Sequence, residues 1–278
     1  MTASRRFSQV DVFTAVPLMG NPVAVVLDGD GLSTEQMQAM AAWTNLSETT
    51  FVLPPTQDGA DYRVRIFTPK AELPFAGHPT LGTAHAVIEA GIAKPREGRL
   101  VQECAVGLVE LTVGADRLSF RLPRYALTEL NDPEATGWIN APVKGAAQAV
   151  DVGPVWLVAE VDGIAALEDL AHDEARLAAY YVPKGWTGAT LYAAEGDRVV
   201  VRSFAPGDGI PEDPVCGSGN GAAAAFRLMA GQVSSGDAYR ASQGRQVGRD
   251  GWIDVRFDGG DIHIGGQCVT VIKGTASI

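Results

Sequence analysis

A segment that occurs twice constrains the fold of this chain more than any other feature. Val64–Pro69 reads VRIFTP, and 137 residues later (201 − 64) Val201–Pro206 reads VRSFAP. Both copies continue through a proline-containing loop and a glycine into a helix-forming run, TLGTAHAVIEAG in one and GNGAAAAFRLMAG in the other. This spacing exceeds the roughly 20–50 residues of solenoid repeats. The repeat therefore predicts two homologous domains, each contributing one strand, one loop and one helix at equivalent places.

The predicted helices of the two copies also begin and end alike. After a short insertion, Ala76–His78 corresponds to Cys216–Ser218 at an offset of 140 residues (216 − 76). Each helix-forming run closes on a glycine, Gly91 or Gly231, which suits the position just past a helix end. The duplication thus predicts two helix N-termini in matching surroundings.

Short segments rich in β-branched residues and bounded by turn residues dominate the rest of the chain, which is typical of strands. Ser33–Gln36 is a capping-box pattern that predicts a helix through MQAMAAW, and LEDLAHDEARLAAYY at 167–181 predicts a second amphipathic helix. The sequence therefore predicts an α+β protein with two sheet-rich lobes, each built around a central helix. The polar, turn-rich stretch 123–137 suggests lobes at 1–124 and 125–265, with the final strand, about 266–278, as a candidate to return to the first lobe.

Composition narrows the classes of partner. The 278 residues carry a formal net charge of −11, which disfavours a nucleic-acid backbone or an anionic membrane face as partner. There is no run of about 18 apolar residues such as a membrane-spanning helix needs. The three cysteines lie far apart and form no CxxC pair, a pattern that fits a reducing compartment. We expect a cytoplasmic protein with a small-molecule ligand.

Two candidate site residues lie in the first half of the chain. Glu48, in the segment NLSET, precedes a predicted strand, where its side chain can point into a cleft or lie at the surface as an ordinary loop glutamate. His78 stands at a predicted helix start, and Pro79 suits the first turn. A histidine there can hydrogen-bond a substrate whose carboxylate binds the helix N–H groups, or it can simply cap the helix.

The segment EDPVCGSGN carries the third candidate set. Asp213 and Ser218 offer an acceptor and a donor beside Gly217 and the N–H groups of a helix start, where the helix dipole favours an anion. The third glycine is misplaced for a dinucleotide-binding loop, and no Gly-Lys-Ser/Thr follows as in a phosphate-binding P-loop. A serine-hydrolase elbow is also missing, because Cys216 stands where GxSxG needs glycine. The histidines form no i,i+4 pair, so no metal site is predicted.

The segments NLSETTFV, FTPKAELPFAGHPTLGTAHA and EDPVCGSG, in this order, closely resemble the PhzF-like (phenazine-biosynthesis) family. That family shares its fold with diaminopimelate epimerase, and the resemblance runs from VDVFT near the start to VTVIKG near the end. It implies two pseudo-symmetric lobes, each a β-rich, barrel-like sheet around a central helix, with a site in the cleft. It also implies a homodimer that uses no metal or organic cofactor.

The resemblance assigns roles to single residues. The acid/base glutamate of the family falls on Glu48, and the implied reaction resembles the isomerisation of a dihydro-hydroxyanthranilate. Glu48 would take a proton from a carbon next to an unsaturated system and return it elsewhere on the same face of a small carboxylate-bearing substrate. The implied substrate-binding positions are Gly77, His78, Asp213, Gly217 and Ser218.

One departure from the family leaves alternatives open. The epimerase branch uses two cysteines that face each other, and here Cys216 falls on one of these positions while the other is Ala76. In the phenazine enzymes the position of Cys216 is usually a threonine. The chain can therefore also be an amino-acid epimerase or racemase that uses Glu48 and Cys216 as unlike bases, or a binding or interaction module without turnover. Residues near Trp43 or Trp186 are candidates for the pocket wall that selects the substrate.

Overall fold

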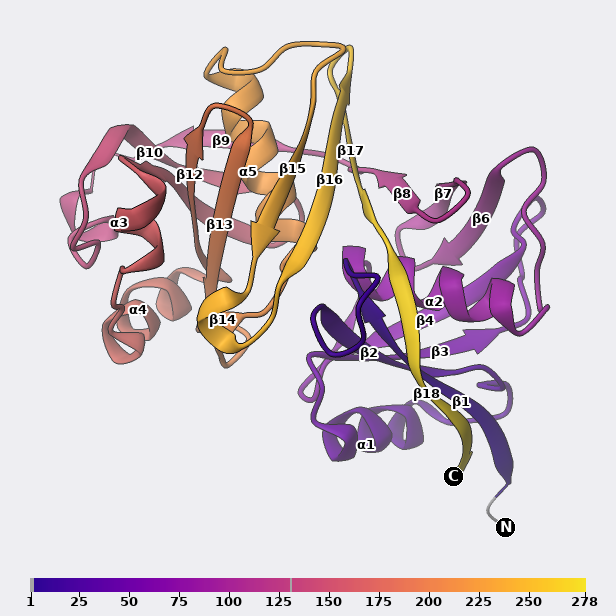
Figure 1. The fold of residues 1–278 in the computed structure, drawn as a ribbon. Helices are drawn as coiled ribbons and strands as arrows, with labels where there is room; N and C mark the ends of the chain where they lie inside the picture. Colours follow the sequence, from indigo (N-terminus) through magenta and orange to yellow (C-terminus); the bar gives the residue numbers. More distant parts are fainter. Residues whose placement is uncertain (1–2, 131) are drawn as a thin grey trace. The chain divides into compact units, whose positions relative to one another are not determined.

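The computed structural model describes residues 3–130 and 132–278, and its chain divides into two compact units. The first unit comprises Met1–Phe120 and Gly265–Ile278, and the second comprises Arg121–Ile264. Figure 1 follows the chain through both units. None of the helices in the described residues is long and apolar enough to cross a membrane.

Among its described residues, the first unit contains two helices and a set of mostly short strands. Its elements are β1 (Ser4–Val12), β2 (Asn21–Val26), α1 (Thr34–Thr44), β3 (Glu48–Leu53), β4 (Tyr62–Phe67), β5 (Glu72–Leu73), α2 (Gly77–Glu89), β6 (Arg99–Cys104), β7 (Gly107–Val113), β8 (Leu118–Arg121) and β18 (Cys268–Ser277).

The second unit repeats this plan with two short helices in the place of α1. Its elements are β9 (Ala126–Glu129), η1 (Pro133–Ala135), β10 (Val143–Asp151), β11 (Val155–Val161), α3 (Ile164–Glu168), α4 (Glu174–Tyr181), η2 (Val182–Lys184), β12 (Gly188–Glu195), β13 (Arg198–Ala205), β14 (Ile210–Asp213), α5 (Gly217–Met229), β15 (Ala238–Gln243), η3 (Arg245–Val247), β16 (Gly251–Asp258) and β17 (Asp261–Gly266).

Strand pairing confirms the predicted duplication. In the first unit β2 runs parallel to β3, and β4 pairs antiparallel with β3 and β5 and parallel with β6. In the second unit β11 runs parallel to β12, and β13 pairs antiparallel with β12 and β14 and parallel with β15. The repeated hexapeptide supplies β4 and β13, and both central helices, α2 and α5, have 13 residues. The α+β class with two pseudo-symmetric lobes is therefore correct.

β1 and its equivalent in the second unit, β10, obtain their second strand neighbours from different parts of the chain. β18 pairs antiparallel with β1 from Val12↔Cys268 to Ser4↔Ser277, so the end of the chain belongs to the first unit. In the second unit the equivalent neighbour of β10 is β9, which precedes it directly in sequence.

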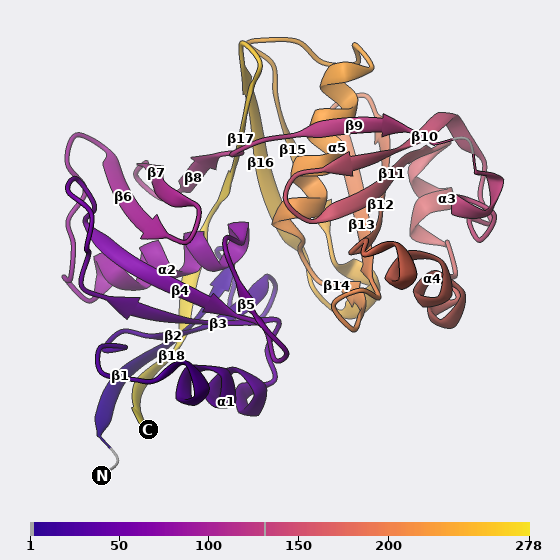
Figure 2. The ribbon, with the colours of Figure 1, turned by 180° about the vertical axis from the view of Figure 1, so that it is seen from behind.

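Each central helix is enclosed by the sheet of its own unit. α2 packs against β1, β2 and β3, and α5 packs against β10, β11 and β12, as Figure 2 shows from behind. Small residues allow this close packing: a Cβ atom at Gly82 would lie 2.3 Å from Val23 Cγ1. Both helices end as predicted, with Gly91 and Gly231 in the left-handed region at φ 68°.

The sheet of the first unit has a helix on each face. Successive residues of a strand point to opposite sides, so neighbouring residues of β3 contact different helices. Thr50 of β3 lies 2.8 Å from Thr83 of α2 between hydroxyl oxygens. The next residue, Phe51, packs in a cluster with Met37 and Ala41 of α1. α1 begins with the predicted capping box, in which the Ser33 hydroxyl accepts from the Gln36 N–H.

The prediction of one helix over 167–181 is wrong. The segment forms α3 and α4 with a break between them, and Asp173 caps the N-terminus of α4 by accepting from Arg176 N. Arg202 Nη1 donates to the carbonyls of Leu167 at 3.0 Å and Leu170 at 2.6 Å. This guanidinium takes up carbonyls that a continuous helix would use itself, which explains why α3 ends there.

Candidate functional site

Glu48 and His78 are brought together in the first unit. Glu48 is the first residue of β3, and it has the same parity as Thr50, which contacts α2. His78 is the second residue of α2, and its Nε2 lies 3.2 Å from Glu48 Oε2. The side chains are 7% exposed for His78 and 14% for Glu48, so this contact is largely shielded from water. A carboxyl group and an imidazole at this distance can share a proton.

Two small residues shape the helix start beside this pair. A Cβ atom at Gly77 would lie 2.8 Å from Phe120 Cζ, so the aromatic ring can pack there only against glycine. Ala76 is the N-cap of α2 and makes no side-chain capping hydrogen bond. Helix N-terminal N–H groups that lack a capping side chain suit an anion such as a carboxylate.

In the second unit the equivalent helix start is capped by a thiol. Cys216 Sγ accepts from Gly219 N at 3.2 Å and lies 3.5 Å from Ser218 Oγ. Burial, and then the neighbouring Asp213 carboxylate, raise the pKa of the Cys216 thiol well above its usual value. Cys216 is therefore a neutral thiol at neutral pH.

Asp213 and Ser218 flank this helix start. Asp213 ends β14, is 9% exposed, and its Oδ1 accepts from Val215 N at 3.0 Å. Trp156 Nε1 on β11 donates to Ser218 Oγ at 3.2 Å. The structure thus gathers Asp213, Cys216, Gly217 and Ser218 at one end of α5.

Gln243 holds this group together, and sequence reasoning missed it. Its Oε1 accepts from Cys216 N at 3.2 Å and from Asn220 Nδ2 at 2.8 Å, and its Nε2 donates to the Asp213 carbonyl at 3.0 Å. One buried amide therefore links β14, the helix start and β15. No local motif marks Gln243, and its role becomes visible only when β15 is placed beside α5.

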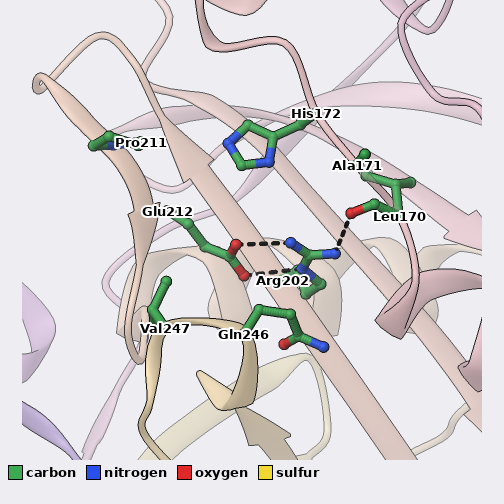
Figure 3. A pocket seen from close by; sticks show the side chains of 8 residues that line it. All are labelled: Leu170, Ala171, His172, Arg202, Pro211, Glu212, Gln246 and Val247. Carbon is green, nitrogen blue, oxygen red and sulfur yellow. Dashed lines mark hydrogen bonds and ion pairs between the residues drawn. The ribbon is translucent and has the colours of Figure 1, made fainter.

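A buried ion pair anchors the strand that carries Asp213. Arg202 and Glu212 form two hydrogen bonds of 2.9 and 2.7 Å, and each side chain is 4% exposed. Figure 3 shows the guanidinium facing the carboxylate, with His172 and Gln246 also lining this cavity of about 610 Å³. Because Glu212 directly precedes Asp213, the pair restrains the backbone from which Asp213 projects.

The tryptophans named from the sequence lie elsewhere. Trp43 is 82% exposed on α1, and Trp186 stacks on Tyr181 with ring centroids 6.1 Å apart. Trp156, which sequence reasoning did not single out, is the tryptophan that contacts Ser218. Across residues 3–130 and 132–278, no group of three or more His, Cys, Asp or Glu side chains is placed to hold a metal ion.

Comparisons with known proteins find similarity over nearly the whole chain. The model of a family described as phenazine biosynthesis-like protein matches residues 10–274. Antisense-enhancing sequence 1 of Schizosaccharomyces pombe is 38% identical, with 98% of each chain covered. A trans-2,3-dihydro-3-hydroxyanthranilate isomerase of Pseudomonas aeruginosa is 36% identical over 91% of each chain.

Comparison with solved structures shows that the fold is also similar. The PhzF-family phenazine biosynthesis protein of Bacillus anthracis superposes with a TM-score of 0.86 at 23% identity, covering 99% of this chain and all of that one. A hydroxyproline epimerase from Agrobacterium vitis superposes with a TM-score of 0.69 at 16% identity, covering 99% of this chain and 93% of that one. The predicted epimerase-like fold is thereby confirmed. Since the family model and relatives above 30% identity span nearly the whole chain, it belongs to the phenazine biosynthesis-like (PhzC-PhzF) family and is an isomerase by class.

Proposed function

We propose that this isomerase moves a proton on a small carboxylate-bearing substrate, cyclic or amino-acid-like, with Glu48 as acid and base and without a cofactor. The observation that carries the proposal is the contact between Glu48 Oε2 and His78 Nε2 at 3.2 Å, largely shielded from water at the start of α2. A water-poor environment strengthens a hydrogen bond to a carboxyl group and keeps bulk water from exchanging the proton it carries.

The reaction needs one group that works in both directions. Ionised Glu48 takes a proton from a carbon next to an unsaturated system, and the electron pair of the broken C–H bond moves into that system. The Glu48 carboxylic acid then returns the proton to a different carbon, so that substrate and product are isomers and no oxidant or reductant is required. His78 orients the Glu48 carboxyl group during both transfers.

The remaining predicted residues bind the substrate in this proposal. N–H groups at the start of α2, beside Gly77, suit a carboxylate, and Ala76 leaves them without a side-chain cap. In the second unit, Ser218 and Asp213, next to Gly217, offer a hydroxyl and a carboxylate, groups that suit a ring substituent or an amino group. The name of the Pseudomonas aeruginosa relative supports testing a dihydro-hydroxyanthranilate first.

The test compares Glu48→Gln with the wild-type protein on trans-2,3-dihydro-3-hydroxyanthranilate in deuterated water, followed by proton NMR. We expect Glu48→Gln to lower kcat by a factor of about 10²–10⁴, since it removes general acid–base catalysis, while Kd for the substrate changes little. Glu129→Gln, at an exposed position on β9, is the matched control and should turn over normally. Equal turnover by Glu48→Gln and wild type would exclude Glu48 as the base.

A further inference from the structure

A second polar cavity lies within the Arg121–Ile264 unit, and none of its lining residues takes part in the proposed reaction. It has a volume of about 590 Å³, within the usual range for small-molecule sites, and its lining comes from the start of β13, the last turn of α5, β15, η3 and β16. Its basic lining residues are Arg198, Arg227, Arg240 and Arg245. Arg227 follows Gly217 by ten residues, which is about 15 Å along the α5 axis.

Arg227 is the unusual member of this set. It is 9% exposed, and its guanidinium carbon lies 4.3 Å from the ring centroid of Tyr239 and 5.7 Å from that of Tyr192. Within the part of the chain that the structure describes, its Nε and Nη1 atoms are buried and have no hydrogen-bond partner. A buried charged donor without an acceptor is costly, and neither stacking on tyrosine nor the side-chain hydrogen bond between Arg227 and Tyr239 replaces an anion.

The nearby carboxylate of Glu160 is already engaged. Glu160 Oε2 accepts from Gln232 Nε2 at 2.7 Å and from Tyr192 OH at 3.2 Å, and Glu160 Oε1 lies 3.5 Å from Lys144 Nζ. Its two oxygens therefore serve groups other than the Arg227 guanidinium.

Of the other arginines that line the cavity, two form ion pairs with aspartates and one is exposed to solvent. Arg240 Nε lies 3.0 Å from Asp254 and Arg245 Nε lies 3.1 Å from Asp250, so both charges have protein partners. Arg198 is exposed at the start of β13. The positive charge available to a ligand thus comes from Arg227 inside the cavity and Arg198 at its edge.

The cavity is also lined by two aspartates and two aromatic residues. Asp237 accepts hydrogen bonds from the N–H and hydroxyl of Ser234, and Asp197 is exposed at the edge. Tyr239 and Trp252 add flat apolar surface, and the Arg240 guanidinium covers Trp252 at 4.9 Å.

We propose that this cavity binds a small organic anion, with its carboxylate or phosphate group on Arg227 and its apolar body against Tyr239 and Trp252. An oxyanion in the cavity supplies an acceptor to the Arg227 guanidinium, which can offer such a group two parallel donors through Nη2 and either Nε or Nη1. Neither Glu48 nor a residue at the start of α5 lines the cavity, so its occupation does not depend on the proposed reaction.

The experiment follows the Nε–Hε resonance of Arg227 in proton–nitrogen spectra of the full-length protein during titration with benzoate and, separately, inorganic phosphate. We expect a saturable shift with at least one probe, and the two arms distinguish a carboxylate ligand from a phosphate ligand. Arg227→Gln should weaken binding about tenfold to a hundredfold, the loss expected for hydrogen bonds to a charged group. Arg256→Gln, an exposed substitution on β16, should bind like wild type.

Two further measurements keep the proposal open to refutation if Arg227→Gln does not fold. Arg198→Gln changes an exposed side chain and should weaken binding severalfold, because it removes the second available charge. Glu48→Gln should bind the probe at Arg227 with wild-type affinity, whatever happens to turnover. An Arg227 resonance that stays unmoved by both probes, or unchanged affinity in Arg227→Gln, would refute the site.

Discussion

At the scale of single residues, Cys216 is the residue whose role the structure clarifies most. The sequence leaves it open whether Cys216 is a second base or a neutral residue of the pocket wall. In the structure its thiol is 3% exposed, caps α5 and has a raised pKa. A buried neutral thiol cannot accept a proton at neutral pH, which argues against its use as a base opposite Glu48.

We therefore expect Cys216→Ser to keep isomerase turnover within about threefold of wild type, since the serine hydroxyl oxygen can replace the sulfur as the cap of α5. Under the alternative of an epimerase or racemase, Cys216 is the second acid/base, and the same change should lower kcat about 10²-fold or more. Steady-state turnover, together with deuterium incorporation into the product, separates the two. Strong loss of turnover with full solvent exchange would favour the two-base reaction.

Gln243 shows why part of the site escaped sequence reasoning. Glu48, His78 and Asp213 lie in short segments whose residue types indicate a catalytic or binding site. Gln243 contributes through contacts with residues 23 to 30 positions earlier, and its strand was not among those predicted. Such long-range polar contacts have no local pattern to identify them.

We expect Gln243→Ala to raise KM for the carboxylate substrate more than it lowers kcat, because the α5 start binds substrate in the proposed reaction while Glu48 is untouched. The lost hydrogen bonds should also reduce the free energy of unfolding by about 1–3 kcal/mol. Gln243→Glu keeps the acceptor for Cys216 N and should restore part of the affinity. Gln246→Ala, which removes one exposed hydrogen bond to the Glu168 carbonyl, is the control. If KM in Gln243→Ala equals that of wild type, Gln243 has only a structural role.

At the scale of elements, the repeat predicts β4, β13, α2 and α5 well. Both copies show the same order of a β-rich hexapeptide, a glycine at the helix start and a glycine just past the helix end. The strands β9 and β17 lack a strong local sequence signal. Ala126–Glu129 falls in a stretch interpreted as a polar boundary, and Asp261–Gly266 ends in two glycines, which are depleted in strands. Both strands form because neighbouring strands offer unpaired backbone groups, and this tertiary context outweighs weak local preference.

The break between α3 and α4 has the same kind of cause. Amphipathic periodicity over 167–181 favours one helix, but Arg202, a residue of β13, binds carbonyls at the end of α3. The same guanidinium pairs with Glu212 on β14. Buried Arg202 thus connects α3 and the segment that follows it to β14, the strand that ends in Asp213. Hydrophobic periodicity in the sequence cannot reveal this link.

At the scale of the whole molecule, the return of the C-terminal strand to the N-terminal unit makes the ends of the chain interdependent. β18 supplies a neighbour for β1 along its whole length and also contacts α2, whose first turn carries His78. The stability of the unit that holds Glu48 therefore depends on a strand that lies far from β1 in the sequence.

We expect truncation after Gln267, which removes β18, to unfold the Glu48 unit while the Arg121–Ile264 unit stays folded. At about 1 kcal/mol for each net hydrogen bond, the lost ladder is comparable with the roughly 5–15 kcal/mol that stabilises a typical domain, and the exposed edge of β1 adds to the loss. Differential scanning calorimetry should show the loss of one transition, and limited proteolysis should leave a fragment that begins near Arg121.

Truncation after Gly274 is the matched control, because it removes only the last register pairs, those of Ser4, Arg5 and Arg6, and the backbone hydrogen bonds between Ala3 and Ile278. It should lower the melting temperature of the first transition without abolishing it. Survival of both transitions after loss of the whole strand would mean that α2 and the strands β1–β8 suffice for the first unit. In that case the pairing of β18 with β1 would be dispensable for presenting Glu48 and His78.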